Sequence, residues 1–114
     1  MPDSSIKTLE TMLDISAYRQ RILTSNIANA DTPGYRAKDI DFQGELDRAL
    51  ASGGKVGSIT IHEPMTTLPN RDGNTVNIDV EMAKIAENSL TYNAATQLLT
   101  MKLRMLKSII NGGP

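Results

Sequence analysis

The chain has 114 residues, 12 basic against 13 acidic, and a formal net charge of -1. This length allows a single unit, residues 1–114. The near-neutral net charge does not indicate nucleic-acid binding, which requires an excess of basic residues. Without cysteine the chain has no disulfide or thiolate metal site, and it has only three tyrosines and one phenylalanine. No apolar run approaches the roughly 18 residues that span a bilayer, so we expect no membrane span. The N-terminus also lacks the apolar core of a cleaved signal peptide.

A first long helix is expected over residues 5–30. Its apolar residues recur in alternating steps of three and four, which is the spacing of a helical seam with two polar positions in its middle. Pro33 cannot continue the helix and restricts the residue before it. The predicted seam comprises Ile6, Leu9, Leu13, Ser16, Gln20, Leu23, Ile27 and Ala30.

The end of this helix, residues 24–42, is rich in Asn, Asp and Thr and contains a Pro-Gly pair. One interpretation is local: Asn29 or Asp31 caps the helix, and Pro33-Gly34 forms a type II turn. The other is a fixed elbow whose side-chain amides bind neighbouring chains. The residue pattern alone leaves both open.

The middle, residues 31–76, contains many Gly and Pro residues, which predicts a loop-rich segment. We expect a short helix over Phe42–Ala51, with Leu46, Ala49 and Leu50 on one side, and a possible short strand over Ser58–Ile61. We expect Ile40 and Phe42 to point inward and Asp39 and Asp41 into water.

Two patterns in this middle segment are weak indications of a metal site or a catalytic site. The run from Asp39 to Gly44 resembles the start of a calcium loop, but its twelfth position is Leu50 where a glutamate is needed. His62 is the only histidine, and no nucleophile elbow accompanies it. The sequence therefore predicts no catalytic residue, no metal site and no cofactor.

A second long helix is expected over residues 77–111. Asn77 is a suitable N-cap, and Asn111-Gly112-Gly113 is a stop signal. The three-four spacing is unbroken along Ile78, Met82, Ile85, Ser89, Tyr92, Thr96, Leu99, Leu103, Leu106 and Ile110. The fold class is thus mainly α, with two long helices on either side of a loop-rich middle.

The two helices differ in length, about 39 Å against about 50 Å. Pairing them leaves roughly two turns of apolar side chains uncovered, and each such side chain in water forgoes about 1.5–3 kcal/mol. We therefore expect the isolated chain to be marginally stable and to complete its core with neighbouring chains.

The segment from Ser25 to Arg36, SNIANADTPGYR, resembles the N-terminal signature of the bacterial flagellar rod, hook and hook-associated family. The continuation AKDIDF at Ala37–Phe42 and the segment DGNTVN at Asp72–Asn77 are similar to the proximal rod members, as are Glu81, Asn88 and Tyr92. The resemblance covers about residues 7–46 and 72–110. Asn77 departs from the more usual Asp, and the segment 51–71 is short.

This resemblance implies that the N- and C-terminal helices form an antiparallel coiled coil. It also implies a structural subunit of the basal-body rod, without enzymatic activity, that transmits torque and encloses the export channel. Implied partners are further copies, other rod proteins, the rod-base adaptor and the export gate, but no nucleic acid or small-molecule substrate. Export by the flagellar type III system to the periplasmic rod is also implied. The resemblance assigns an assembly elbow to Asn26, Ile27, Ala28, Asn29, Thr32, Gly34 and Tyr35, and helix–helix contacts to Leu9, Leu13, Leu23, Leu99, Leu103 and Leu106.

Three other interpretations remain open. The chain could be another rod component, such as rod protein C. It could be a soluble coiled-coil adaptor or export chaperone that never enters a filament. It could also be a small hydrolase that uses His62.

Overall fold

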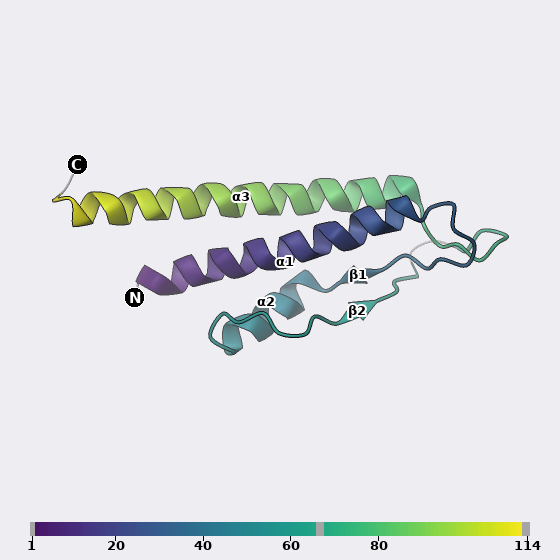
Figure 1. Cartoon of the computed structure of the whole chain (residues 1–114), viewed down its shortest axis with the longest axis horizontal. Coiled ribbons are helices and arrows are strands. Elements are labelled where there is room, and N and C mark those ends of the chain that lie inside the picture. The colour runs from purple at the N-terminus through teal and green to yellow at the C-terminus, as the bar shows by residue number, and fades with distance from the viewer. Residues whose placement is uncertain (1, 66–67, 113–114) are drawn as a thin grey trace.

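A computed structural model of the chain describes residues 2–65 and 68–112. The molecule is elongated, 65 × 26 × 16 Å. Figure 1 shows α1 lying between α3 on one side and a thin layer of α2, β1 and β2 on the other, with both chain ends at the same end of the molecule. The elements are α1 (Pro2–Ala28), β1 (Asp39–Ile40), α2 (Phe42–Ala51), β2 (Ile61–His62) and α3 (Ile78–Ile110).

The two long helices run antiparallel, so the expected mainly helical fold is confirmed. α1 spans Pro2–Ala28 rather than residues 5–30. It begins earlier because proline is tolerated in the first helical turn, where its missing N–H has no partner to lose. It ends earlier because the N–H of Ala30 bonds to the carbonyl of Ile27, three residues back, which tightens the chain into turns.

α3 spans Ile78–Ile110, close to the expected 77–111. Asn77 is its N-cap, as predicted, and its side chain accepts a hydrogen bond from the N–H of Val80 at 3.2 Å. Asp79 and Glu81 in the first turn and Lys107 in the last complement the helix dipole.

The middle segment contains the expected helix, α2, over Phe42–Ala51. The strand, however, is Ile61–His62 rather than Ser58–Ile61. It pairs antiparallel with β1, with Asp39 opposite His62 and Ile40 opposite Ile61. The partner strand therefore fixes the position of β2, which the pattern of isoleucines alone had placed too early.

One expectation in this segment is wrong. Asp39 is buried, not in water, because Arg19 of α1 reaches across to its carboxylate. Asp41 is exposed and Ile40 is buried, as predicted.

The apolar core lies between α1 and the middle layer. Ile15 of α1 packs with Ile40 of β1 and Leu46 of α2, and all three are buried. Around them pack Met12, Tyr18, Ile22, Phe42, Val56 and Ile59. α2 thus covers the face of α1 that α3 leaves open, and α1 is the central element of the fold.

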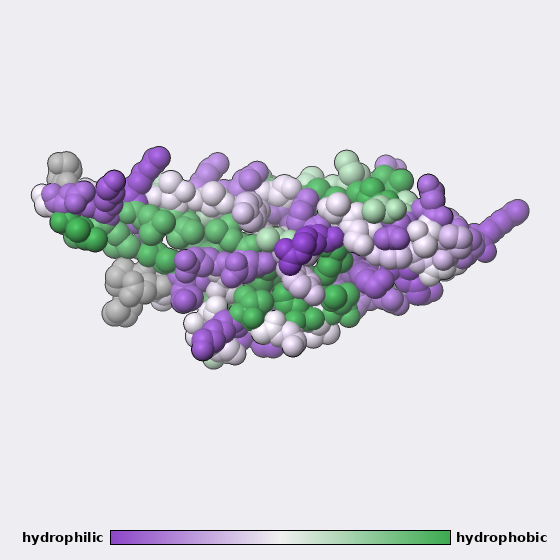
Figure 2. All heavy atoms as spheres, viewed as in Figure 1, coloured by the Kyte–Doolittle hydropathy of each residue, from purple (hydrophilic) through white to green (hydrophobic). Residues whose placement is uncertain are grey.

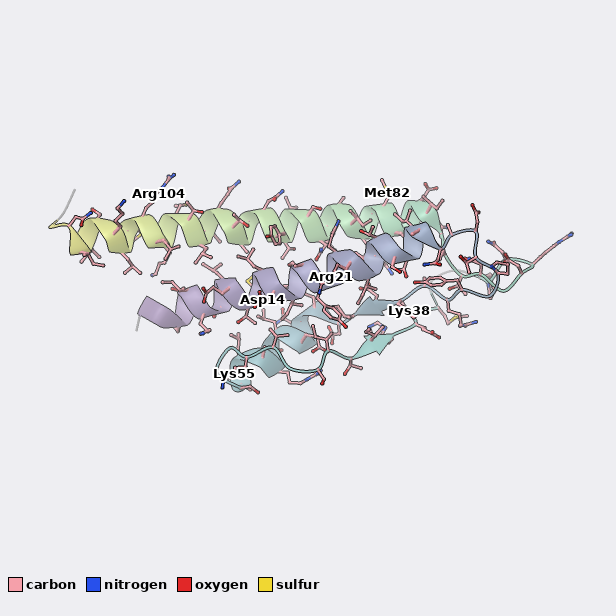
Figure 3. All side chains as sticks on the ribbon, viewed as in Figure 1. Asp14, Arg21, Lys38, Lys55, Met82 and Arg104 are labelled. Carbon is pink, nitrogen blue, oxygen red and sulfur yellow. The ribbon has the colours of Figure 1, made fainter. Side chains whose placement is uncertain are left out.

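The contact between α1 and α3 is mostly polar at its centre. On α3 the buried side chains are Glu81, Asn88 and Ala95, which are seven residues apart and so lie on one line along the helix. The apolar seam predicted for α3 lies beside this line: Ile78, Met82 and Leu103 are each about half exposed. Figure 3 shows Met82 pointing away from α1. The side of α3 that faces α1 is therefore rotated from the one its apolar spacing predicts, so that part of the predicted seam is exposed while Ile85, Leu99 and Leu106 remain half-buried.

Candidate functional site

The elbow, residues 26–35, is built around the side chain of Asn26, which is fully buried. Its amide nitrogen donates to the carbonyl of Lys38 and to the Glu81 carboxylate, both at 2.7 Å. Its amide oxygen accepts from the hydroxyl of Tyr35 at 3.1 Å and from the N–H of Lys38 at 3.0 Å. Both amide protons and both oxygen lone pairs are thus used within the chain, and Asn26 has no hydrogen-bonding capacity left for a neighbour.

A second buried amide, Asn74, ties the elbow to the loop that precedes α3. Its nitrogen donates to the carbonyls of Asn29 and Thr32, at 2.9 and 2.7 Å, and its oxygen accepts from the N–H of Val76 at 2.7 Å. Each of these two carbonyls also accepts a backbone N–H, so Asn74 supplies a second donor to both and fixes the turn that follows α1.

Backbone hydrogen bonds complete this junction. The N–H of Gly34 donates to the carbonyl of Asp72 at 2.8 Å, and the N–H of Thr75 donates to that of Tyr35 at 3.0 Å. The hydroxyl of Thr75 accepts from the N–H of Ala37 at 2.8 Å. The two motifs that resembled rod proteins, SNIANADTPGYR and DGNTVN, are therefore bonded to each other and form one structural unit.

The turn at Pro33-Gly34 is as predicted. The N–H of Tyr35 bonds to the carbonyl of Thr32 at 3.2 Å, and Gly34 has a φ of +75°, the left-handed value that a type II turn requires at its third residue. The cap is Asn29, whose amide donates to the carbonyl of Ser25 at 2.8 Å, whereas Asp31 is exposed.

The predicted elbow residues differ in their exposure. Asn26 is buried, Asn29, Ile27 and Tyr35 are half-buried, and the rest are exposed: Ala28, Thr32 and Gly34. Only this last group, together with parts of the half-buried side chains, offers a surface to another molecule.

An ion cluster joins all three layers next to the elbow. Arg19 of α1 contacts Asp39 of β1 with two nitrogens, at 2.8 and 3.0 Å, and Glu87 of α3 with a third at 3.1 Å. Lys84 of α3 lies 3.6 Å from the same Asp39 carboxylate. Burial raises the pKa of Asp39, but the hydrogen bonds from Arg19 and from the Ile40 N–H, with the charges of Arg19 and Lys84, outweigh it and hold this pKa below its ordinary value.

The predicted helix–helix leucines are not equivalent in the structure. Leu23 is completely buried, and four others are half-buried: Leu9, Leu13, Leu99 and Leu106. Leu103 is 50% exposed. Within one chain, Leu103 therefore has much of its surface free for a contact with another molecule.

The roles of Arg19, Asp39, Asn74 and Glu81 were missed from the sequence. Glu81 and Asn88 carry a signal in retrospect, because they stand a heptad apart on one helical line, where a polar residue marks a specific contact. Asp39 and Asn74 carry none, since their partners lie 20 or more residues away along the chain.

The described residues show no arrangement typical of catalysis or metal binding. His62 is exposed on the short strand β2. No cluster of three or more His, Asp or Glu that could hold a metal ion occurs within residues 2–65 and 68–112. None of the described helices has both the length and the apolar character needed to cross a membrane.

Comparison with known proteins points to one family. A family model described as "Flagella basal body rod protein" matches residues 16–36, which include the second half of α1 and the whole elbow. The flagellar basal body rod protein FlgB of Salmonella typhimurium is 35% identical over 97% of this chain and 96% of its own length.

Other relatives agree. The FlgB protein of Escherichia coli (strain K12) is 33% identical over the same shares of both chains. That of Cereibacter sphaeroides is 41% identical over 82% of this chain and 84% of its own length. Identity at this level across nearly the whole chain shows the family, and this chain belongs to the FlgB family of flagellar basal body rod proteins.

Proposed function

We propose that this chain is a structural subunit of the flagellar basal-body rod, where it assembles with other rod components through its terminal helices. The role is structural rather than enzymatic, as membership of a rod protein family indicates. Of the earlier interpretations, the hydrolase, the soluble adaptor or chaperone and rod protein C are not favoured, because the full-length relatives are FlgB proteins.

One observation carries the proposal from the structure. α3 leaves apolar side chains exposed along its whole length, including Met82 at 55%, Leu98 at 52% and Ile109 at 71%. Figure 2 shows such residues gathered along the C-terminal half of α3. A continuous exposed apolar surface marks a protein contact, and a rod subunit has neighbours along its length to cover it.

The elbow then has a definite role in the proposal. It holds α1, the middle layer and the start of α3 at fixed angles through Asn26 and Asn74, so that each copy presents the same surface. Thr32, Gly34 and Tyr35 lie at this junction and are the elbow residues we propose for contacts between subunits.

Two finer points belong to the same proposal. We infer that the partners at the rod base are the adaptor and the export gate, and that the chain travels unfolded through the flagellar type III system. The thin core supports the second point: it centres on Ile15, Ile40 and Leu46, so unfolding exposes little buried apolar surface.

Leu103→Asp tests the rod role. The side chain is half exposed in the single chain, so we expect a small effect on its own folding and loss of incorporation into rods, because a carboxylate would be buried at the contact. Gln97→Asp is the matched control: it adds the same residue at an exposed position of the same helix, on the side away from α1.

Both variants would be expressed in a flagellated strain that lacks its own FlgB. The measurement is the amount of each variant in purified basal bodies relative to its total in the cell, with swimming as a second readout. A motile strain with normal incorporation of Leu103→Asp would overturn the assignment of this α3 surface to assembly.

A further inference from the structure

A small pocket lies between α1 and the segment of chain that leads into β1. We call it the cation pocket. It has a volume of about 240 Å³ and is lined by Tyr18, Arg21, Ile22, Ser25, Tyr35 and Lys38. The two charged residues of this lining are both basic: Arg21 comes from α1, and Lys38 directly precedes β1 (Figure 3). The pocket therefore combines two positive charges from segments that are distant in sequence.

Each of the two cations lies against a tyrosine ring. The guanidinium of Arg21 is 5.4 Å from the centre of the Tyr18 ring, and the ammonium of Lys38 is 4.3 Å from the centre of the Tyr35 ring. The negative face of an aromatic ring attracts a cation at these distances. The rings therefore favour one position for each charge, although both side chains have flexible stems.

The Lys38 side of the pocket is part of the elbow. The hydroxyl of Tyr35 and the N–H of Lys38 both donate to the amide oxygen of Asn26, at 3.1 and 3.0 Å. The ammonium of Lys38 donates to the carbonyl of Arg36 at 3.4 Å. Because an ammonium has three donors, two of them remain for a ligand. The buried Asn26 thus fixes this wall of the pocket within the chain itself.

Neither charge is neutralised within the chain. Arg21 and Lys38 form no ion pair within residues 2–65 and 68–112. The nearby Arg19 differs, because it contacts the carboxylates of Asp39 and Glu87. Two like charges that line one small pocket repel each other. An anion that contacts both removes this repulsion, so charge complementarity indicates an anionic ligand.

The rest of the lining favours a carboxylate on a carbon chain over an inorganic anion. Ile22 and the two tyrosine rings offer apolar contact to methylene groups, which sulfate and phosphate lack. Ser25 adds a hydroxyl that can donate to an oxygen. The guanidinium of Arg21 can contact both oxygens of a carboxylate with two parallel N–H groups.

We propose that the cation pocket binds the side-chain carboxylate of an aspartate or glutamate on a partner protein other than this chain. Arg21 contacts both carboxylate oxygens, Lys38 supplies the second charge, and Ile22 packs against the methylene groups. Copies of this chain have no long-range attraction for one another, since each has a net charge of -1. This inference rests on the proposed rod function and names the chemistry of one contact beside the elbow.

A titration of the isotope-labelled chain by NMR tests the pocket. The probe is the capped amino acid Ac-Glu-NH₂, which has a single carboxylate, and Ac-Gln-NH₂ is its neutral match. Arg104 is the internal control, because it is exposed and forms no ion pair or ring contact within residues 2–65 and 68–112. We expect the Nε–H signal of Arg21 to reach half-saturation at on the order of tenfold lower probe concentration than that of Arg104, because two cations share the carboxylate.

Variants that each remove one charge extend the titration. In Lys38→Gln we expect the Arg21 signal to respond like that of Arg104, and in Arg21→Gln we expect the ring signals of Tyr35 to stop responding. Lys55→Gln, at an exposed position outside the pocket, is the matched control, and far-UV circular dichroism checks the fold of each variant. Equal responses of Arg21 and Arg104 in the parent chain, or equal binding of Ac-Gln-NH₂, would overturn the proposal. Sulfate that binds as tightly as Ac-Glu-NH₂ would show an adventitious ion only.

A double charge reversal, Arg21→Glu with Lys38→Glu, tests the partner in a flagellated strain that lacks its own FlgB. Lys55→Glu with Arg71→Glu makes the same change in net charge at exposed positions outside the pocket. We expect on the order of tenfold less of the pocket variant than of this control in purified basal bodies, because like charges then meet at the contact. Motile revertants of the pocket variant are expected to replace an aspartate or glutamate of another protein by lysine or arginine.

The outcomes separate this contact from the rod role. Revertants that replace acidic residues of this chain would identify a second copy as the occupant and overturn the proposal, as would revertants that replace no acidic residue. Equal incorporation of the two double variants overturns the contact and leaves the rod role intact. Absence of the parent chain from basal bodies overturns the rod role, while the NMR titration still decides whether the pocket binds a carboxylate.

Discussion

Removing the amide of Asn26 tests whether the elbow depends on one buried side chain. In Asn26→Ala, the Glu81 carboxylate, which is 1% exposed, loses the donor at 2.7 Å, and the N–H of Lys38 loses its acceptor. A hydrogen bond to a charged group contributes about 1.5–3 kcal/mol, and an unsatisfied buried N–H costs about 1–3 kcal/mol. We therefore expect a loss of about 4 kcal/mol, a large part of the roughly 5–15 kcal/mol that stabilises a typical domain.

Asn29→Ala is the matched control, because it removes the same side chain three residues later. The Asn29 amide bonds to the carbonyl of Ser25 and to the hydroxyl of Thr32, both of which are exposed to water. Water can replace these bonds, so the expected loss is about 0.5–1 kcal/mol. The measurement is urea unfolding followed by circular dichroism, in trimethylamine N-oxide, which stabilises the native state without screening charge.

A double-mutant cycle with Glu81→Ala separates the hydrogen bond from general loss of packing. If Asn26 and Glu81 interact directly, the double variant is less destabilised than the sum of the two single variants, by about 1.5–3 kcal/mol. Equal losses for the Asn26 and Asn29 variants, or a coupling free energy below about 0.5 kcal/mol, would refute the argument.

Two further predictions concern the ion cluster and the turn. The folded chain holds the pKa of Asp39 below its ordinary value, so this carboxylate stabilises the fold at neutral pH and that stability is lost as pH falls below about 4. Thermal melts between neutral and acidic pH are expected to show a smaller acid loss for Asp39→Asn than for the parent, and an equal loss would contradict this. Gly34→Ala is expected to lower the free energy of unfolding by about 1–2 kcal/mol, because its φ is +75°. A Cβ at this position meets no atom within 4 Å, so the cost is conformational and not steric contact with a neighbour. Gly57→Ala, also in open space but with no positive φ, is expected to be neutral or slightly stabilising by urea unfolding, and equal effects at the two glycines would contradict the assignment.

The elements that could be predicted are those with local causes. The Asn77 cap, the turn at Pro33-Gly34 and the bounds of α2 each depend on residues within a few positions of one another. The start of α1 is an exception. The prediction placed it at residue 5, whereas the helix begins at Pro2, which the first helical turn tolerates.

The features that could not be predicted depend on contacts between distant segments. Arg19 draws Asp39 out of water across 20 residues, and Asn26 draws Glu81 inward across 55. From sequence alone, an acidic side chain is predicted to be exposed, because burial of an unpaired charge is prohibitive. The prediction changes only when its partner is known. The same reasoning applies to β2, whose register follows from β1 and not from its own sequence.

The largest difference concerns which side of α3 faces α1. The apolar spacing of α3 predicted that Ile78, Met82 and Leu103 would lie in the helix pair, whereas Glu81 and Asn88 occupy it. Two specific amide contacts fix that orientation: Asn26 to Glu81, and Asn88 to the carbonyl of Ser16.

This orientation of α3 explains how one sequence can carry an unbroken apolar stripe and still fold as a single chain. Polar contacts fix the orientation of α3. Removing one partner of such a contact costs more than the contact adds in net stability, because the contact itself replaces a bond to water. Much of the apolar stripe, whose burial is worth about 1.5–3 kcal/mol for each large side chain, stays at the surface, including Ile78, Met82 and Ile110. We therefore infer that neighbouring rod subunits add stability by covering this stripe. Polar contacts within the chain would then define its shape, and contacts between chains would complete its apolar burial.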